Sequence, residues 1–425
     1  MRPSTFISFC LSIATIPNAY SQSTTDPTKR AELALSALQI WYNAGTGLWN
    51  TCGWWNSANV LTMIGNFAKR DSNPQLQDLA KRIFANTIVQ APANNPQPGV
   101  EDESTSKRDV QGSGYNKSIS QDGEYVTEFP ENWAASSAYV DVKDLPFMKA
   151  GQDGTPVSAA AVPQASAWLD GFYDDDLWWA LGWIGAYDVT KNMEYLQLAE
   201  GIFMAVTKAW PTGCGNGGIW WSWEKNYANA IANELFLSTA AHLANRAENK
   251  DFYVDWAQKE LQWFLSSGMI NDRGTINDGL NDDCKNNNQT TWSYNQGVIL
   301  GGLVELNRAA PDPSHLQLAS RIAKAAIAEL SDDKGVIHDK CGPYCGGDAS
   351  QFKGIFARNL QLLHEAAPDD AYVKCIQANA DSIWANDRDD GNRLSIDWAG
   401  PFIAPANAST HSSAMDALVA AITVK

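Results

Sequence analysis

Three consecutive aspartates, Asp174-Asp175-Asp176, are the strongest candidates for chemistry in this 425-residue sequence. They stand between Phe172-Tyr173 and Trp178-Trp179, at the predicted start of a helix. A helix N-terminus stabilises carboxylates through its dipole, but one capping aspartate would suffice for that purpose. Further acids among aromatic rings should experience desolvation and mutual repulsion, which separate their pKa values. Because glycosidic cleavage needs one protonated and one ionised carboxyl group, the pattern predicts glycoside chemistry.

Amides and further aromatic side chains recur where other weakly charged helices are predicted to begin. Aromatic rings can cover the C–H faces of a sugar, while amides hydrogen-bond its hydroxyl groups. Any single one of these residues could instead cap a helix or pack in the core, but their recurrence at the same end of successive helices favours a sugar cleft. The candidate substrate-binding residues are Trp55, Asn56, Trp178, Asn229, Asn233, Tyr294, Asn295, Gln296 and Lys353.

The composition agrees with a carbohydrate ligand and argues against other partners. Acids outnumber bases 48 to 31, which gives a formal charge of −17 and disfavours nucleic acids and anionic membranes. The chain also has 18 Trp, 13 Tyr and 14 Phe, more than core packing usually requires. An acidic, tryptophan-rich protein suits a neutral, polar ligand with flat apolar faces, which describes a sugar.

The hydrophobic pattern predicts about twelve helices of two alternating kinds and shows no sustained period-two alternation. Outer helices, such as the one over 74–90, carry charges on one face. Inner helices, such as the one over 294–309, are nearly uncharged and rich in Gly and Ala, which permits close packing. The predicted inner helices begin near residues 56, 176, 227, 293, 354 and 411.

This repetition predicts an all-α (α/α)6 toroid, in which hairpins of one inner and one outer helix close into a ring. An open solenoid is the alternative, but no capping repeat is evident. We expect residues 22–425 to form a single domain with a long polar excursion at about 91–167. We expect this excursion to be partly ordered over one rim of the toroid, because several of its large side chains need partners: Trp133, Tyr139, Phe147 and Met148.

Residues 1–21 have the pattern of a signal peptide. Arg2 precedes the apolar stretch Phe6–Ile16, and Ala19-Tyr20-Ser21 supplies small residues at a cleavage site. The apolar stretch is too short to span a bilayer, and the C-terminal segment Ala414–Lys425 resembles neither a membrane anchor nor a lipid-attachment signal. We therefore expect a secreted, soluble protein without a membrane span. Three glycosylation sequons agree with this route, at Asn116, Asn288 and Asn407.

Removal of the leader would take away Cys10 and leave an even number of cysteines, as expected of disulfide bonds in an exported protein. The six allow 15 connectivities. Cys341 and Cys345 lack a second ligand pair at the spacing of a zinc site, so we expect no metal. The cysteines expected to pair are Cys52, Cys214, Cys284, Cys341, Cys345 and Cys375.

The segment Tyr173–Ile184 resembles the Tyr-Asp-Asp-x-x-Trp-Trp-Ala-Leu signature of glycoside hydrolase family 76, which contains endo-α-1,6-mannanases and related fungal cell-wall proteins. Asn229–Leu235, Thr291–Gly297 and Phe352–Arg358 are also similar to that family. The resemblance implies an (α/α)6 fold and a retaining mechanism that passes through a covalent mannosyl-enzyme and uses no metal or cofactor. It implies Asp174 as nucleophile and Asp175 as acid/base, and it leaves Asp176, a variable position, with helix capping alone.

The leading interpretation is a secreted retaining endo-α-1,6-mannanase acting on α-1,6-linked mannan or mannooligosaccharides, which we expect to be a monomer. One alternative is a mannan transglycosylase of cell-wall assembly, in which a sugar hydroxyl instead of water captures the intermediate. Cell-wall proteins of that kind tend to carry a lipid-attachment signal. Because the segment Ala414–Lys425 does not resemble one, hydrolysis is favoured over transglycosylation. A non-catalytic mannan-binding protein is the third reading, but binding alone does not require adjacent acids among aromatics.

Overall fold

Twelve α-helices dominate the computed structural model, which describes residues 24–98, 116–119, 125–128 and 165–424. The predicted leader lies outside the described residues, and so do Trp133, Tyr139, Phe147 and Met148 of the predicted excursion. Within the described part, no helix is both long enough and apolar enough to cross a membrane.

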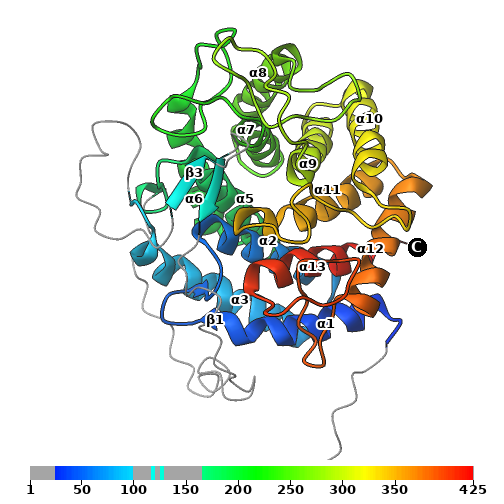
Figure 1. The fold of residues 1–425 in the computed structure, drawn as a ribbon. Coiled ribbons are helices and arrows are strands. Elements are labelled where there is room, and N and C mark those ends of the chain that lie inside the picture. The colour runs from blue at the N-terminus through cyan, green and yellow to red at the C-terminus, as the bar shows by residue number, and fades with distance from the viewer. Residues whose placement is uncertain (1–23, 99–115, 120–124, 129–164, 425) are drawn as a thin grey trace, which may run out of the picture.

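Six inner helices form a closed ring (Figure 1). Each packs against the next along the chain, and the last, α13, packs against the first, α2. This closure confirms the predicted (α/α)6 toroid and excludes an open solenoid. The inner helices are α2 (Trp54–Arg70), α5 (Tyr173–Thr190), α7 (Ala230–Ala244), α9 (Ser293–Ala309), α11 (Phe352–Ala366) and α13 (Ala408–Ala420).

Six outer helices surround this ring, and several begin at the cap residues that the sequence suggests (Figure 1). Asp26, Asn73 and Asp312 each accept a hydrogen bond from a first-turn backbone N–H, and each is followed by proline at the first helical position. The outer helices are α1 (Pro27–Leu38), α3 (Pro74–Gln90), α6 (Met193–Val206), α8 (Lys250–Ser267), α10 (Pro313–Leu330) and α12 (Asp370–Asn386).

Glycine allows the inner helices to approach one another closely. A Cβ atom at Gly297 of α9 would lie 2.6 Å from the Phe356 backbone of α11, and one at Gly354 of α11 would lie 2.5 Å from the Ser413 backbone of α13. Neither position can accept a larger residue without moving a helix. The small residues predicted for the inner helices therefore set the diameter of the ring.

A repeated turn leads the chain from an outer helix back to the next inner helix. Asn271 follows α8, Asp332 follows α10 and Asp389 follows α12. In each turn one side-chain oxygen accepts backbone N–H groups from the residues two and four positions later. The pair Asp332-Asp333 therefore belongs to a turn, as its sequence suggests.

The remaining elements are short. Two antiparallel strand pairs occur, β1 (Tyr42–Asn43) with β2 (Leu48–Trp49) and β3 (Asn116–Ile119) with β4 (Tyr125–Glu128). The second pair belongs to the predicted excursion, and β4 contacts the 3-10 helix η7 at the start of α11. The 3-10 helices are η1 (Gln39–Trp41), η2 (Ala91–Asn94), η5 (Ala165–Ala167), η6 (Thr207–Ala209) and η7 (Asp348–Ser350).

The prediction that all six cysteines pair is wrong. Cys214 bonds Cys284 and Cys341 bonds Cys345, whereas Cys52 and Cys375 are free thiols. Cys52 precedes the inner helix α2, and Cys375 lies on the outer helix α12. Burial raises the pKa of both thiols to about 12, so both remain protonated at neutral pH.

Candidate active site

The predicted catalytic pair lies at the mouth of the toroid, in the first turn of α5. Because outer helices return the chain between inner helices, the inner helices run in one direction and their N-terminal ends meet at this mouth. Asp174 is partly exposed there, and its Oδ2 accepts a hydrogen bond of 3.1 Å from the indole Nε1 of Trp221. Asp175 is only 1% exposed. The helix dipole favours negative charge at both positions.

The third aspartate has a different role from the helix capping expected of it. Phe172 occupies the N-cap position of α5 and makes no side-chain capping bond. Asp176 is buried, and its Oδ1 accepts the backbone N–H of Asp170 at 3.0 Å. Asp176 therefore fixes the segment that enters α5 instead of capping the helix.

Aromatic rings from four inner helices form a continuous row at this mouth. Trp178 of α5 stacks on Trp55 of α2 at 5.7 Å between ring centroids, and Trp55 stacks on Phe352 of α11 at 6.3 Å. Phe352 in turn stacks on Tyr294 of α9 at 3.7 Å. The Trp55 indole Nε1 also donates a hydrogen bond of 2.7 Å to Oδ1 of Asp348. The predicted residues Trp55, Trp178 and Tyr294 thus belong to one row of packed rings. Trp55 is 4% and Trp178 2% exposed, and Trp178 also lines a pocket at the opposite end of the ring.

A further carboxylate at the mouth, Asp278, escaped the sequence analysis. Its Oδ2 accepts a hydrogen bond of 2.5 Å from the Tyr227 hydroxyl, which also accepts one of 3.0 Å from Nδ2 of Asn287. Burial, followed by the charges of Asp278 and Asp174, raises the pKa of Tyr294 well above its usual value. These two carboxylates therefore share an electrostatic environment with Tyr294.

One local signal could have located Asp278. It precedes Gly279, where a Cβ atom would lie 2.5 Å from the Tyr227 hydroxyl. Only glycine allows that hydroxyl to reach the carboxylate beside it. Recognising this requires knowing that the two loops meet, which the sequence does not reveal.

Several predicted amides lie beneath the mouth and hold its loops. Asn233 accepts the backbone N–H of Ile219 at 2.7 Å and donates to its carbonyl at 3.0 Å. Gln296 does the same for Ile276, with both bonds at 2.8 Å. Asn229 caps α7 by accepting the N–H of Ala232. These side chains use their hydrogen-bonding groups on the backbone of the loops.

The other predicted binding residues are also buried. Asn56 and Gln351 exchange two hydrogen bonds of 3.0 Å. Lys353 donates from Nζ to the Ile396 carbonyl at 2.7 Å and lies over the Trp398 ring, so its ammonium group is engaged within the protein. Asn295 is fully buried, and its amide atoms find no hydrogen-bond partner among the described residues.

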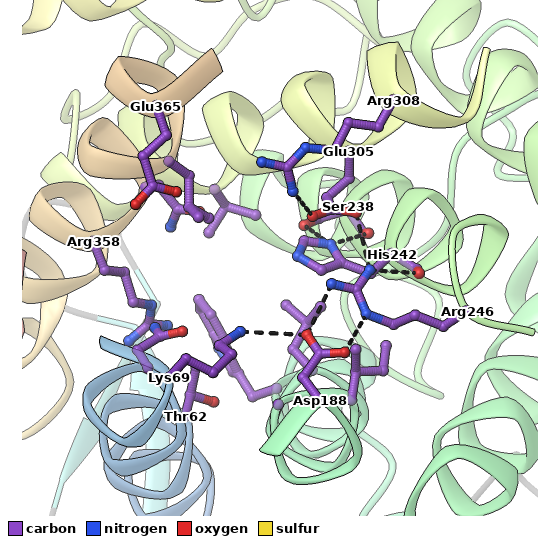
Figure 2. A pocket seen from close by; sticks show the side chains of 18 of the residues that line it. Thr62, Lys69, Asp188, Ser238, His242, Arg246, Glu305, Arg308, Arg358 and Glu365 are labelled. Atoms are coloured by element: carbon purple, nitrogen blue, oxygen red, sulfur yellow. Dashed lines mark hydrogen bonds and ion pairs between the residues drawn. The ribbon is translucent and has the colours of Figure 1, made fainter. Parts of the chain in front are cut away.

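A second charged pocket lies at the opposite, C-terminal ends of the inner helices (Figure 2). It encloses about 360 Å³. Arg246 binds both carboxylate oxygens of Asp188 at 2.8 and 2.9 Å and one oxygen of Glu305 at 2.9 Å. Lys69 lies 3.3 Å from Asp188, and Arg308 lies 2.8 Å from Glu305.

Two acids of this second pocket, Asp188 and Glu305, are poorly suited to proton transfer. Burial opposes ionisation of Asp188, but hydrogen bonds from Arg246 and the charge of Lys69 outweigh it and lower its pKa to about 2. Burial likewise opposes ionisation of Glu305, but the nearby His242 and Arg246 lower its pKa to about 2. Groups that stay ionised at neutral pH cannot protonate a leaving group, so the mouth is the better candidate for catalysis.

Among the described residues, no three His, Cys, Asp or Glu side chains gather as metal ligands would. The groups available at the mouth are carboxylates, a phenol and indole N–H donors. An (α/α)6 toroid with these groups and a wall of aromatic rings at one end is the architecture of a carbohydrate-active protein.

The sequence profile of glycosyl hydrolase family 76 matches residues 148–424, more than half of the chain. The chain belongs to this family. The match includes Asp174, Asp175 and five of the six inner helices, and it confirms the family resemblance of the motifs.

Curated relatives agree with this assignment. A putative mannan endo-1,6-alpha-mannosidase of Schizosaccharomyces pombe is 31% identical over 214 residues, which are 46% of this chain and 48% of the relative. The mannan endo-1,6-alpha-mannosidase DFG5 of Saccharomyces cerevisiae is 26% identical over 263 residues, 56% of each chain. The matched segments thus span about half the length of these relatives.

Solved structures share the fold over nearly the whole chain. An inactive variant of the α-1,6-mannanase GH76A of Salegentibacter, in complex with α-1,6-mannotetrose, superposes with a TM-score of 0.69 at 16% identity, covering 94% of this chain and 100% of that one. Dfg5 of Chaetomium thermophilum, in complex with glucosamine, gives a TM-score of 0.67 at 17% identity, covering 95% and 92%.

Proposed function

We propose that this protein is a retaining endo-α-1,6-mannanase that hydrolyses linear α-1,6-mannan. The observation that carries the proposal is the position of Asp174 and Asp175 at the aromatic mouth of a family 76 toroid. The names of the curated relatives support the choice of substrate. The inactive Salegentibacter mannanase carries substitutions of two consecutive aspartates, which supports an adjacent pair as the catalytic acids.

In the proposed mechanism, Asp174 attacks the anomeric carbon while Asp175 donates its proton to the glycosidic oxygen. The glycosidic C–O bond breaks, and a covalent mannosyl ester forms on Asp174. Asp175, now ionised, removes a proton from a water molecule, whose oxygen attacks the anomeric carbon. The ester bond to Asp174 breaks, and the mannan fragment leaves with the original configuration at its new reducing end. The Trp221 indole holds one oxygen of Asp174 and so fixes the plane of the attacking carboxylate.

The substrate wall and the loop contacts support the division of roles among the candidate residues. Tyr294, which is partly exposed, would face the sugar rings, and Trp55 and Trp178 would support this row of rings from its buried side. Asp278 would bind hydroxyl groups. Asn56, Asn229, Asn233, Gln296 and Lys353 would act by holding the loops around the mouth. Asn295 would lie behind this wall.

Reducing ends released from linear α-1,6-mannan test the proposal. A hydrolase produces new reducing ends, a transglycosylase rearranges chain lengths without a matching gain in ends, and a binding protein does neither. Retention has its own test, since proton NMR during the first minutes of hydrolysis should show the α anomer before mutarotation. Initial release of the β anomer would overturn the covalent mechanism.

We also propose secretion, supported by the leader pattern in residues 1–21 and by the two disulfides. Among the sequons, Asn288 is exposed and accessible to a glycan. Asn407 is buried and caps α13 by accepting the N–H of Thr410, so its side chain is already engaged. Glycopeptide mass spectrometry of the secreted protein should find Asn407 unmodified.

A further inference from the structure

The segment between α10 and α11 contains a loop whose two ends are both tied to the mouth. At one end, Asp339 accepts the backbone N–H of Ser293 at 2.8 Å and its hydroxyl at 2.7 Å, next to Tyr294. At the other end, Asp348 accepts the Trp55 indole N–H at 2.7 Å. The intervening residues 340–347 therefore project from the rim beside the aromatic row.

The tip of this loop presents one bare aromatic ring. Tyr344 is 85% exposed, a larger fraction than any other large hydrophobic side chain among the described residues. The disulfide between Cys341 and Cys345 closes the tip around it, with Cα atoms 4.8 Å apart. A ring held on a cross-linked loop loses little conformational freedom when it binds a ligand, which favours binding.

A polar pocket adjoins the loop on one side. It encloses about 810 Å³ between the segments that precede α9 and α11, and Asn277, Thr290 and Asp339 are among the residues that line it. Asn277 is next to Asp278 of the mouth, and Lys340, at the other wall, leads into the cross-linked tip. Amide, hydroxyl and carboxylate groups of this kind bind sugar hydroxyls.

We propose that the loop from Asp339 to Asp348 is a distal carbohydrate-binding platform, on which the Tyr344 ring stacks against a mannose unit several residues from the cleaved bond. This inference rests on the proposed function, because it takes the mannan chain as the occupant. Stacking on an exposed ring uses the apolar C–H face of the sugar, while the adjoining pocket receives its hydroxyl groups. A short oligosaccharide that fills only the mouth cannot reach both places.

The test compares a long linear α-1,6-mannan with α-1,6-mannotetraose as substrates of wild type, Tyr344→Ala and Tyr344→Phe. Tyr344→Ala should raise KM for the polymer about five- to tenfold and change its kcat less than twofold. The ratio of kcat/KM for polymer to that for tetraose should fall by a similar factor. Tyr344→Phe keeps the ring and should restore polymer KM to within twofold. Leu265→Ala, which trims an exposed side chain on the outer helix α8, is the matched control and should behave as wild type.

Retardation of each variant during electrophoresis through a gel containing mannan gives a second readout that does not depend on turnover. Weaker retardation of Tyr344→Ala supports the platform, even for a protein that binds without cleaving. Cleavage by wild type combined with an unchanged polymer KM and unchanged retardation in Tyr344→Ala overturns the platform alone. A wild type that neither cleaves nor is retarded overturns the platform and the proposed function together.

Discussion

At the scale of single residues, three adjacent aspartates have three different environments. Asp174 is partly exposed and bound by an indole N–H, Asp175 is almost fully buried, and Asp176 binds the backbone of the preceding segment. The helix turn separates their side chains by about 100° per residue, so neighbours in sequence need not share a direction. These different environments mean that substitution of each aspartate should have a different effect on catalysis.

We expect Asp174→Asn and Asp175→Asn each to reduce kcat on α-1,6-mannan by about a hundredfold or more, because each removes a charge or a transferable proton at nearly constant volume. Asp176→Asn keeps an oxygen that can accept the Asp170 N–H and should cost much less. Activity assays and thermal unfolding of the three variants check this. Asp174→Asn activity within about tenfold of wild type, roughly 1.4 kcal/mol in barrier, would contradict the nucleophile assignment. A larger loss at Asp176 would move the pair by one residue.

The sequence predicted which helix ends carry polar groups but not which groups face the substrate. Asn233 and Gln296 occupy inner-helix starts as predicted, yet both bind loop backbones. In the sequence, an amide near a helix start looks the same whether it binds substrate or holds a loop backbone. Gly279 beside Asp278 could not be interpreted from the sequence alone, because the partner Tyr227 lies 51 positions away. The position of the aromatic and acidic cluster at the start of an inner helix was predictable, because clusters of both on one helix have few purely structural explanations.

At the scale of the elements, buried amides connect loop backbones to the helices beside them. Asn233 holds Ile219, Gln296 holds Ile276, and Asn379 on α12 accepts the N–H of Ile337 at 2.9 Å. Helix positions were predictable from hydrophobic periodicity and from caps such as Asp26-Pro27. The hydrogen bonds from these amides to loop backbones were not predictable, since each joins two segments that approach one another only in the closed ring.

Gln296→Ala should lower the free energy of unfolding by about 2–4 kcal/mol, because it leaves the buried N–H and C=O of Ile276 without their partner. The same loop carries Asp278, so we expect kcat/KM on mannan to fall as well. Urea denaturation and initial rates measure the two effects. Gln75→Ala on the exposed face of α3 is the control and should change stability by less than about 0.5 kcal/mol. A Gln296→Ala protein as stable as this control would show that the hydrogen bonds of Gln296 to Ile276 do not stabilise the fold.

At the scale of the whole molecule, one disulfide joins two segments of the mouth, and the other closes a single loop. Cys214–Cys284 connects the segment that carries Trp221 and Tyr227 to the one that carries Asp278, across 70 positions of sequence. An even number of cysteines and an export signal suggested that all six pair. Neither feature shows which cysteines lie close enough to bond in the folded protein. Cys52 and Cys375 belong to separate elements of the ring and remain thiols.

In protein lacking residues 1–21, we expect alkylation under denaturing, non-reducing conditions to modify two cysteines, identified by mass spectrometry as Cys52 and Cys375. The native protein should react slowly, because burial keeps both thiols protonated. A Cys52→Ser/Cys375→Ala variant should take up no label and keep both disulfides. Failure of denatured wild type to react would mean that a third disulfide exists.

The ion pairs in Figure 2 link consecutive inner helices at the end opposite the mouth. Lys69 of α2 pairs with Asp188 of α5, which pairs with Arg246 after α7, which pairs with Glu305 of α9. Cations near helix C-termini also interact favourably with the helix dipoles. Apolar packing therefore closes the ring, and charge at one end adds links between α2, α5, α7 and α9.

This network predicts a specific dependence of stability on pH. The folded-state pKa of Asp188 is lowered from 3.8 to about 2, so the group contributes stability above the unfolded pKa and loses that contribution as pH falls from about 4 towards 2. The shift corresponds to about 2 kcal/mol. Asp188→Asn should therefore be less stable than wild type near pH 6, and the difference should shrink by more than half of that amount near pH 2.5. Urea denaturation at both pH values measures it. Thr62→Ser, an uncharged change in the same pocket, should differ from wild type equally at both. An Asp188→Asn difference that did not vary with pH would show that the carboxylate contributes no charge-dependent stability to the ring.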